Sequence, residues 1–178
     1  APFSPAGPTE DATYERVMEE DLSDLPPQVS KPHEVDNVVP VDDVVGTEID
    51  EVFIGTCTNG RYEDLAIAAK LLSGKRVSKR VRLVVAPASR EILLRCVEDG
   101  IIWKLVKAGA VMVTPGCGPC VGTCGGIPAD GEVVLSTANR NFKGRMGNSN
   151  AFIYLASPAT AACSAIKGVI SDPREVLS

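Results

Sequence analysis

The sequence predicts an α/β fold, a three-layer α/β/α arrangement in which helices cover both faces of a mostly parallel sheet. The pattern of apolar residues along the chain predicts this class. From residue 47 onward, short apolar segments of strand type alternate with segments whose apolar residues have helical spacing. That alternation is typical of parallel sheets, which are buried on both faces.

The expected elements follow in chain order. The segment 81–86 is rich in β-branched residues, and the segment 62–72 carries apolar residues at helical spacing before Gly74. Ser89 is placed to cap a helix that buries Ile92, Leu93 and Val97, and Pro158 suits a first helical turn. We therefore expect strands at 51–54, 81–86, 110–114, 133–137 and 151–155, and helices at 62–72, 89–97, 101–108 and 158–166.

Residues 1–46 differ from the remainder and divide the chain into two parts: an acidic, proline-rich arm or inter-domain connection (1–46) and an α/β domain (47–178). The arm holds seven of the 13 prolines. We expect two helical turns at 12–20, and no regular element from 22 to 40, where prolines interrupt the chain. The start lacks both the features of a signal peptide and an initiator Met, so we expect a processed chain, an excised domain or a fragment.

Charge and cysteine content restrict the class of protein. Residues 1–46 carry a net charge of −9, and the remainder carries +4, which suits a small anionic substrate. The basic residues are scattered, which disfavours nucleic acid as a partner, and no apolar run is long enough to cross a membrane. Six cysteines without a secretory signal indicate a cytoplasmic protein that uses thiols for metal or redox chemistry.

Three cysteines lie in two glycine-rich loops: Cys57 in Gly-Thr-Cys-Thr-Asn-Gly-Arg, and Cys117 and Cys120 in Gly-Cys-Gly-Pro-Cys-Val-Gly. Both loops follow expected strands, so they should open on the same edge of a parallel sheet. Three thiolates without a fourth protein ligand leave one coordination position open, as in reactive metal sites.

Two other uses of these cysteines stay open on spacing alone. Cys57, Cys117, Cys120 and Cys124 could form a closed zinc centre. Cys-Gly-Pro-Cys is also a thiol–disulfide exchange motif, but it needs its second cysteine inside a helix, and Val-Gly-Thr-Cys-Gly-Gly is poor helical sequence. A cluster-dependent regulatory protein is a further class.

A third loop, Asn139-Arg140-Asn141-Phe142-Lys143-Gly144-Arg145, follows the expected strand 133–137. The forked guanidinium groups of Arg140 and Arg145 suit bidentate binding of carboxylates. Their position on the same edge as the cysteines favours a substrate role over surface ion pairs.

These segments together resemble the aconitase family. The resemblance rests on the two cysteine loops, on Ser-Thr-Ala-Asn-Arg-Asn-Phe-Lys-Gly-Arg-Met-Gly and on Tyr-Leu-Ala-Ser-Pro-Ala-Thr-Ala-Ala. These motifs are most similar to those of the large subunit of the 3-isopropylmalate dehydratase/homoaconitase branch. The resemblance covers about residues 14–170. It corresponds to the third, cluster-binding domain, so the first two domains are expected to be absent.

The resemblance implies the chemistry residue by residue. Cys57, Cys117 and Cys120 would hold a 4Fe-4S cluster, whose fourth iron would act as a Lewis acid on the substrate hydroxyl. Arg140 and Arg145 would hold substrate carboxylates and Asn139 would lie against the cluster; Asn59 is added only for its proximity to Cys57. The implied reaction is the dehydration and rehydration of a 2-hydroxy di- or tricarboxylate, as in leucine biosynthesis, with homoaconitase or aconitase activity as the alternative.

The remaining residues qualify this interpretation. The family mechanism needs His/carboxylate pairs and a serine base, but this chain has one histidine, His33, which we expect to be a surface or docking residue. We therefore predict that the chain alone is inactive and that it needs a small, swivelling subunit and the other large-subunit domains. Cys124 replaces a usual His and is expected to be a buried small residue, as are Cys96 and Cys163.

Overall fold

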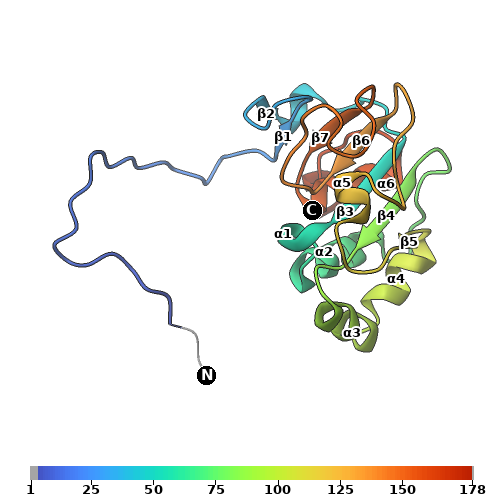
Figure 1. The fold of residues 1–178 in the computed structure, drawn as a ribbon, viewed down its shortest axis with the longest axis horizontal. Helices are drawn as coiled ribbons and strands as arrows, with labels where there is room; N and C mark the ends of the chain where they lie inside the picture. Colours follow the sequence, from blue (N-terminus) through green and yellow to red (C-terminus); the bar gives the residue numbers. More distant parts are fainter. Residues whose placement is uncertain (1–3, 178) are drawn as a thin grey trace.

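The computed structural model describes residues 4–177, and in that range the strands form one seven-stranded mixed sheet (Figure 1). The strands are β1 (Gln28–Ser30), β2 (Val38–Pro40), β3 (Glu51–Gly55), β4 (Arg82–Ala86), β5 (Val111–Met112), β6 (Val133–Ser136) and β7 (Phe152–Leu155). Their order is β2-β1-β7-β6-β3-β4-β5. The last five strands of this order are mutually parallel, and β1 is antiparallel to both of its neighbours. The predicted α/β class with a mostly parallel sheet is confirmed.

The helices occupy the expected places, with short additions. They are α1 (Thr56–Asn59), α2 (Tyr62–Leu72), α3 (Arg90–Glu98), α4 (Ile101–Ala108), α5 (Gly118–Val121), α6 (Pro158–Lys167) and α7 (Arg174–Leu177), with a 3₁₀ turn at Val41–Asp43. The bounds of α2 and α4 are those predicted, whereas α1, α5 and α7 were not predicted. Within residues 4–177, no helix combines the length and the apolar character that crossing a membrane requires.

Local signals explain where the helices begin and end. The Ser89 hydroxyl accepts a hydrogen bond from the Ile92 N–H at 3.3 Å, and the Ser157 hydroxyl accepts one from the Thr160 N–H at 3.1 Å. Helix α6 ends at Gly168, whose φ of 82° is left-handed. Val97 is exposed rather than inward, and Cys96 takes the buried position of α3.

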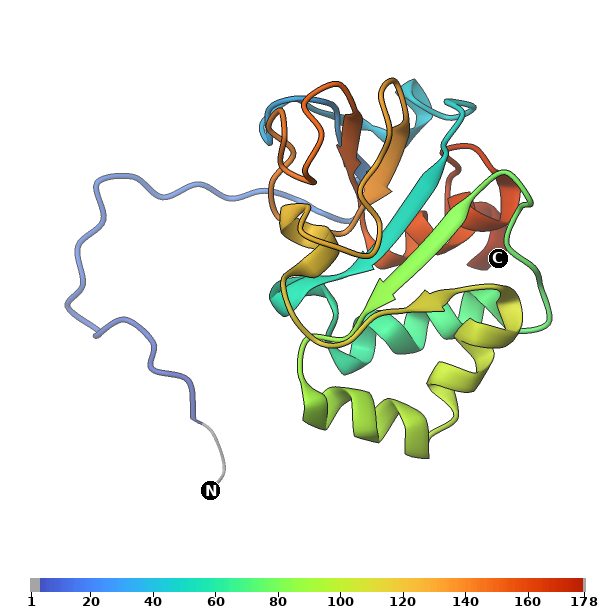
Figure 2. The same ribbon diagram turned by 45° about the vertical axis from the view of Figure 1, so that its right-hand side comes forward.

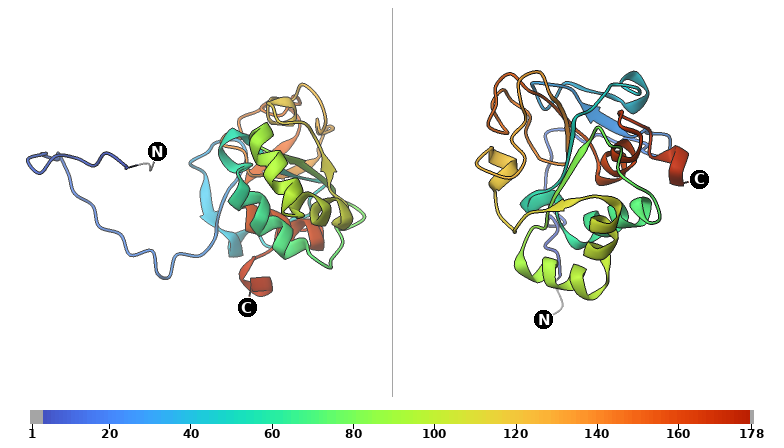
Figure 3. Two further views of the ribbon diagram at one scale, coloured as in Figure 1. Left: turned by 90° about the horizontal axis from the view of Figure 1, so that it is seen from below. Right: turned by 90° about the vertical axis from the view of Figure 1, so that its right-hand side faces the viewer.

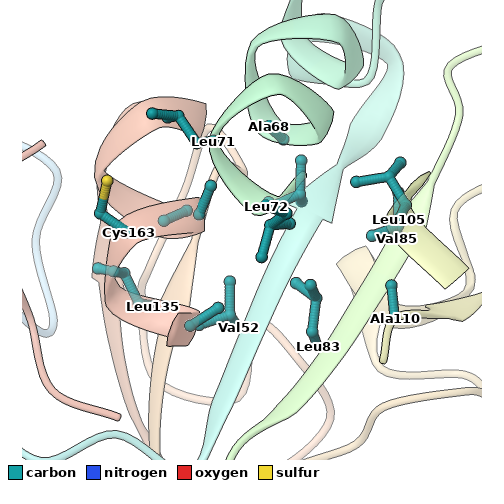
Figure 4. Close-up of a cluster of buried hydrophobic side chains, with 14 of the residues drawn as sticks. Val52, Ala68, Leu71, Leu72, Leu83, Val85, Leu105, Ala110, Leu135 and Cys163 are labelled. Atoms are coloured by element: carbon teal, nitrogen blue, oxygen red, sulfur yellow. The ribbon is translucent and has the colours of Figure 1, made fainter. Parts of the chain in front are cut away.

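The core has two parts because side chains alternate across the sheet. Val52 and Ile54 of β3 belong to the part of the core that packs against α2, α4 and α6, where Leu65 is fully buried. Figure 4 shows Val52 together with the fully buried Leu72 and Leu105 in this part of the core. Phe53 faces the other side, and its cover consists of α5 and of long loops rather than a second set of long helices (Figure 2). The cysteine-bearing loop is therefore part of the cover of one sheet face.

The N-terminal segment corrects two predictions. No helix forms at 12–20; residues 4–24 leave the body as an exposed, extended arm, visible in Figures 1 and 3. Prolines do not exclude regular structure from 22 to 40, because β1 and β2 lie there and bury Val29. Pro40 ends its strand at the sheet edge, where a missing N–H is tolerated. The division into domains at residue 46 stays a prediction.

Candidate cluster and carboxylate site

The three predicted loops meet beyond the carboxyl ends of the parallel strands. Cys57 follows β3 in α1, Cys117 and Cys120 follow β5 at α5, and Asn139 and Arg140 follow β6. Figure 2 shows α1 and α5 at this same edge of the sheet. Open α/β sheets bind ligands at such an edge.

The three cysteines lie in one neighbourhood but in different environments. Cys57 and Cys117 are exposed, whereas Cys120 is buried. Burial raises the pKa of the Cys120 thiol, the Arg145 guanidinium opposes that rise, and negative charge on Cys117 or Cys57 would add to it. Cys57 and Cys117 thus each lie close enough to Cys120 to influence its pKa.

Helix α5 corrects the argument used against thiol–disulfide exchange. Cys117 is its N-cap residue and Cys120 lies inside it, so the motif is helical after all. The helix has a single turn, because Gly122 closes it with a left-handed φ of 71°. A helix this short supplies little of the dipole that activates the first cysteine in exchange proteins.

Glycine-to-glycine packing joins the cysteine loop to the arginine loop. A Cβ atom on Gly122 would lie 2.1 Å from the Gly147 nitrogen, and one on Gly147 would lie 2.8 Å from the Gly122 oxygen. Neither position can hold a side chain without moving backbone. The glycines therefore allow α5 and the segment after Arg145 to approach at backbone distance.

Arg145 connects the predicted substrate residues to the cysteines. Its Nη2 donates a hydrogen bond to the Cys120 sulfur at 3.1 Å, and its guanidinium lies 5.9 Å from the Phe142 ring centre. Arg140 is exposed and donates to the Asn139 carbonyl at 2.5 Å, and Asn139 is exposed as well. One predicted carboxylate ligand thus contacts a predicted cluster ligand, while the other faces solvent.

The loop that carries Cys57 begins with an unusual backbone. Thr56 has a φ of 86°, which is rare for a β-branched residue. Its hydroxyl accepts hydrogen bonds from the N–H groups of Thr58 and Asn59, at 3.3 and 3.2 Å. The Asn59 side-chain amide donates to the Thr137 carbonyl at 2.6 Å, so its nitrogen is engaged by protein; the predicted cofactor role of Asn59 stays a prediction.

The other cysteines and His33 divide by burial. Cys96 and Cys163 are fully buried, as predicted. Cys124 is exposed, so the prediction that it is buried is wrong; it lies in the turn after α5, with its sulfur 2.8 Å from where a Gly118 Cβ would lie. His33 is partly buried, with its ring centre 5.7 Å from that of Phe152, and its role as a surface or docking residue stays a prediction.

The donor set fits a cluster better than a single ion. Among residues 4–177, no three His, Cys, Asp or Glu side chains are arranged to hold one metal ion, which gives no support to the closed zinc centre. A cubane cluster instead spreads its thiolate ligands over separate irons and needs clear backbone around it. Three free cysteines on a glycine-rich edge would supply three such thiolates and would leave a fourth iron without a protein ligand.

Sequence reasoning missed two features, of which only the first lies near the site. Asn141 is fully buried, and its amide donates to the Lys31 carbonyl at 2.9 Å, which ties the arginine loop to the chain beside β1. The sequence feature that could have indicated this residue is the second Asn of the Asn-Arg-Asn segment. A pocket lined by Trp103, Lys104 and Lys107 lies between the ends of α2 and α4, and none of the predicted site residues lines it.

Comparison with known proteins identifies the family to which this chain belongs. The family model of the aconitase family (aconitate hydratase) matches residues 42–168. The chain belongs to the aconitase family.

Several relatives resemble the chain over nearly all of its length. It is 60% identical over 168 residues to a protein named 3-isopropylmalate dehydratase large subunit 2 of Archaeoglobus fulgidus, covering 94% of this chain and 40% of that protein. It is 55% identical over 176 residues to a probable methanogen homoaconitase large subunit of Methanosarcina mazei, covering 99% and 44%. A 3-isopropylmalate dehydratase large subunit of Elusimicrobium minutum is 57% identical over 168 residues, covering 94% and 40%. The chain spans about two fifths of the length of these relatives.

Proposed function

We propose that this chain is the cluster-bearing part of a hydro-lyase that isomerises a 2-hydroxy di- or tricarboxylate by dehydration and rehydration. The observation that supports this proposal most directly is the 3.1 Å hydrogen bond from Arg145 to the Cys120 sulfur, which joins a proposed carboxylate-binding group to a proposed cluster ligand. Since the named relatives are 3-isopropylmalate dehydratase large subunits, 3-isopropylmalate is the first candidate substrate. The homoaconitase names among the relatives make homocitrate the second.

The residues of this chain would divide the work of binding. Cys57, Cys117 and Cys120 would hold a 4Fe-4S cluster, and Asn139 would lie beside it. When bound, such a cluster supplies a Lewis-acidic iron that eases loss of the substrate hydroxyl. Arg145 and Arg140 would bind the substrate carboxylates in bidentate fashion, which orients the carbon skeleton and stabilises its negative charge.

Proton transfer would come from elsewhere in the assembly. His33, the one histidine in the sequence, packs against Phe152 and lines a small pocket with Lys143, and none of the three cysteines lines that pocket. We propose that a small subunit and further large-subunit segments supply the acid and base groups. The isolated chain should therefore bind a cluster yet lack turnover.

Reconstitution tests this proposal in two stages. The chain is first incubated anaerobically with iron and sulfide, and it should become brown with broad visible absorption. It is then mixed with the small subunit and the missing large-subunit segments of a relative, and unsaturated acid formation is followed from 3-isopropylmalate, homocitrate and citrate. Steady turnover by the chain without partners would contradict the division of labour, and a colourless product would contradict the cluster.

A further inference from the structure

A single buried threonine joins the two loops that carry the candidate site. Thr137 directly follows β6 and is 1% exposed. Its hydroxyl accepts a hydrogen bond from the Gly55 N–H at 2.9 Å and lies 3.1 Å from the Gly55 carbonyl, to which it donates. Its own N–H donates to the Phe53 carbonyl at 2.9 Å, and its carbonyl accepts from Asn59 at 2.6 Å.

These four bonds extend the pairing of β6 with β3 beyond the end of the regular ladder. The last paired residues are Phe53 and Ser136. At the next position, the Thr137 hydroxyl takes the place of a backbone partner and forms hydrogen bonds with both the N–H and the carbonyl of Gly55. Gly55 itself is confined, because a Cβ there would lie 2.7 Å from the Ala86 carbonyl.

The clamped segment is the one that directs Cys57. Gly55 is followed by Thr56, whose positive φ turns the chain, and then by Cys57. A strained residue persists only where its surroundings fix it. On the other strand, Thr137 stands two residues before Asn139 and three before Arg140. The same side chain therefore fixes the start of both loops.

We propose that Thr137 is a positioning residue whose hydroxyl fixes Cys57 relative to the Asn139–Arg140 loop. Its effect on a cluster rests on the proposed function; the clamp on the Cys57 loop does not. Valine has nearly the shape of threonine but would leave both polar groups of Gly55 buried and unpaired. Serine keeps the hydroxyl, so it should preserve the clamp.

Hydrogen exchange in the metal-free chain tests the clamp directly. In Thr137→Val, amides of residues 55–59 should exchange at least tenfold faster than in wild type, and Thr137→Ser should restore slow exchange. Thr160→Val is the matched control, because Thr160 is also fully buried but its hydroxyl contacts Ser157, the N-cap residue of its own helix α6, and makes no hydrogen bond to residues 55–59. It should leave residues 55–59 unchanged. Unchanged exchange in Thr137→Val, or equal acceleration in the control, would overturn the clamp.

A second variant keeps the test informative if Thr137→Val does not fold. Asn59→Ala removes only the bond to the Thr137 carbonyl at a half-buried position, so the chain should fold. Exchange at residues 56–60 should rise several-fold. Exchange at the wild-type rate would count against the clamp.

Cluster retention separates positioning from a general structural role. After reconstitution, the visible absorption should decay several-fold faster in a chelator with Thr137→Val than with Thr137→Ser or Thr160→Val. Faster exchange with unchanged decay would make Thr137 structural only and overturn the positioning role. If wild type takes up no cluster, the proposed function fails, while the exchange experiment still decides the clamp.

Discussion

Glu51 is the residue whose environment most conflicts with its charge. It is fully buried on β3, and its Oε1 has no hydrogen-bond partner. Its Oε2 accepts from Arg82 Nη2 at 3.0 Å, and Arg82 also binds Glu132. Burial raises the pKa of Glu51 to about 7, although the Arg82 hydrogen bonds oppose the rise. The same guanidinium lowers the pKa of Glu132.

The raised pKa predicts a pH-dependent stability. From the ordinary value of 4.5 to about 7, the folded chain holds a proton on Glu51 that the unfolded chain has released. Stability should therefore fall as pH rises through this window, by up to about 3 kcal/mol, and level off above it. Urea unfolding of wild type and Glu51→Gln from pH 5 to 8 checks this. Parallel curves for the two proteins would contradict it; Glu132 titrates at lower pH and does not interfere.

Arg145 is the residue at which substrate binding is most directly testable. In the reconstituted assembly, Arg145→Lys should raise the KM for the hydroxy acid by about 10- to 100-fold, because an ammonium group loses the bidentate contact. Arg90→Lys, an exposed arginine at the start of α3, serves as the control and should leave KM unchanged. An unchanged KM in Arg145→Lys would remove this residue from the substrate site.

Individual site residues could be predicted from the sequence where they lie within a recognisable motif. The cysteines and arginines stand in recognisable segments, and their shared edge follows from the parallel sheet. The Thr137–Gly55 pair was not predictable, because its partners are 82 residues apart and meet only through the register of β3 and β6. Cys124 was misjudged since composition says nothing of whether a turn faces solvent.

Helices were predicted correctly where the spacing of apolar residues and the residues at the helix ends indicated the same segment. Helices α2, α4 and α6 have apolar stripes and clear end signals. Strands β1 and β2 were missed because their three residues are too short for a pattern and lie among prolines. Their place in the sheet depends on tertiary contacts, including the bonds from Asn141. Helix α5 was missed because glycine and proline dominate its sequence.

The approach of α5 to the arginine loop predicts a large effect of one methyl group. Gly122→Ala should lower the free energy of unfolding by about 1–3 kcal/mol beyond the cost of its positive φ, because the Cβ would meet the Gly147 backbone. Gly131→Ala is the matched control: its φ of 78° is similar, but nothing lies within 4 Å of the added Cβ. Urea unfolding measures both, and equal losses would contradict the close approach.

At the scale of the whole molecule, the arm and the body contribute differently to stability. Residues 4–24 are exposed apart from the partly buried Ala12, and their hydrogen bonds are local, such as that from the Ser23 N–H to the Asp21 carboxylate. Removing residues 1–24 should change the free energy of unfolding by less than about 0.5 kcal/mol. Removing residues 1–34 should destabilise the chain strongly, since it deletes β1 and exposes Asn141. Calorimetric unfolding of both truncations checks this, and equal melting temperatures would contradict it.

The proposed function requires that Cys57, Cys117 and Cys120 hold the cluster without a fourth cysteine. The most direct measurement is the iron and sulfide bound after anaerobic reconstitution, with visible absorption, for four single variants to serine. Cys57→Ser, Cys117→Ser and Cys120→Ser should each lose the brown chromophore, whereas Cys124→Ser, which changes an exposed thiol in the same loop, should keep it with wild-type iron content. A retained chromophore in any of the first three, or its loss in Cys124→Ser, would contradict the account.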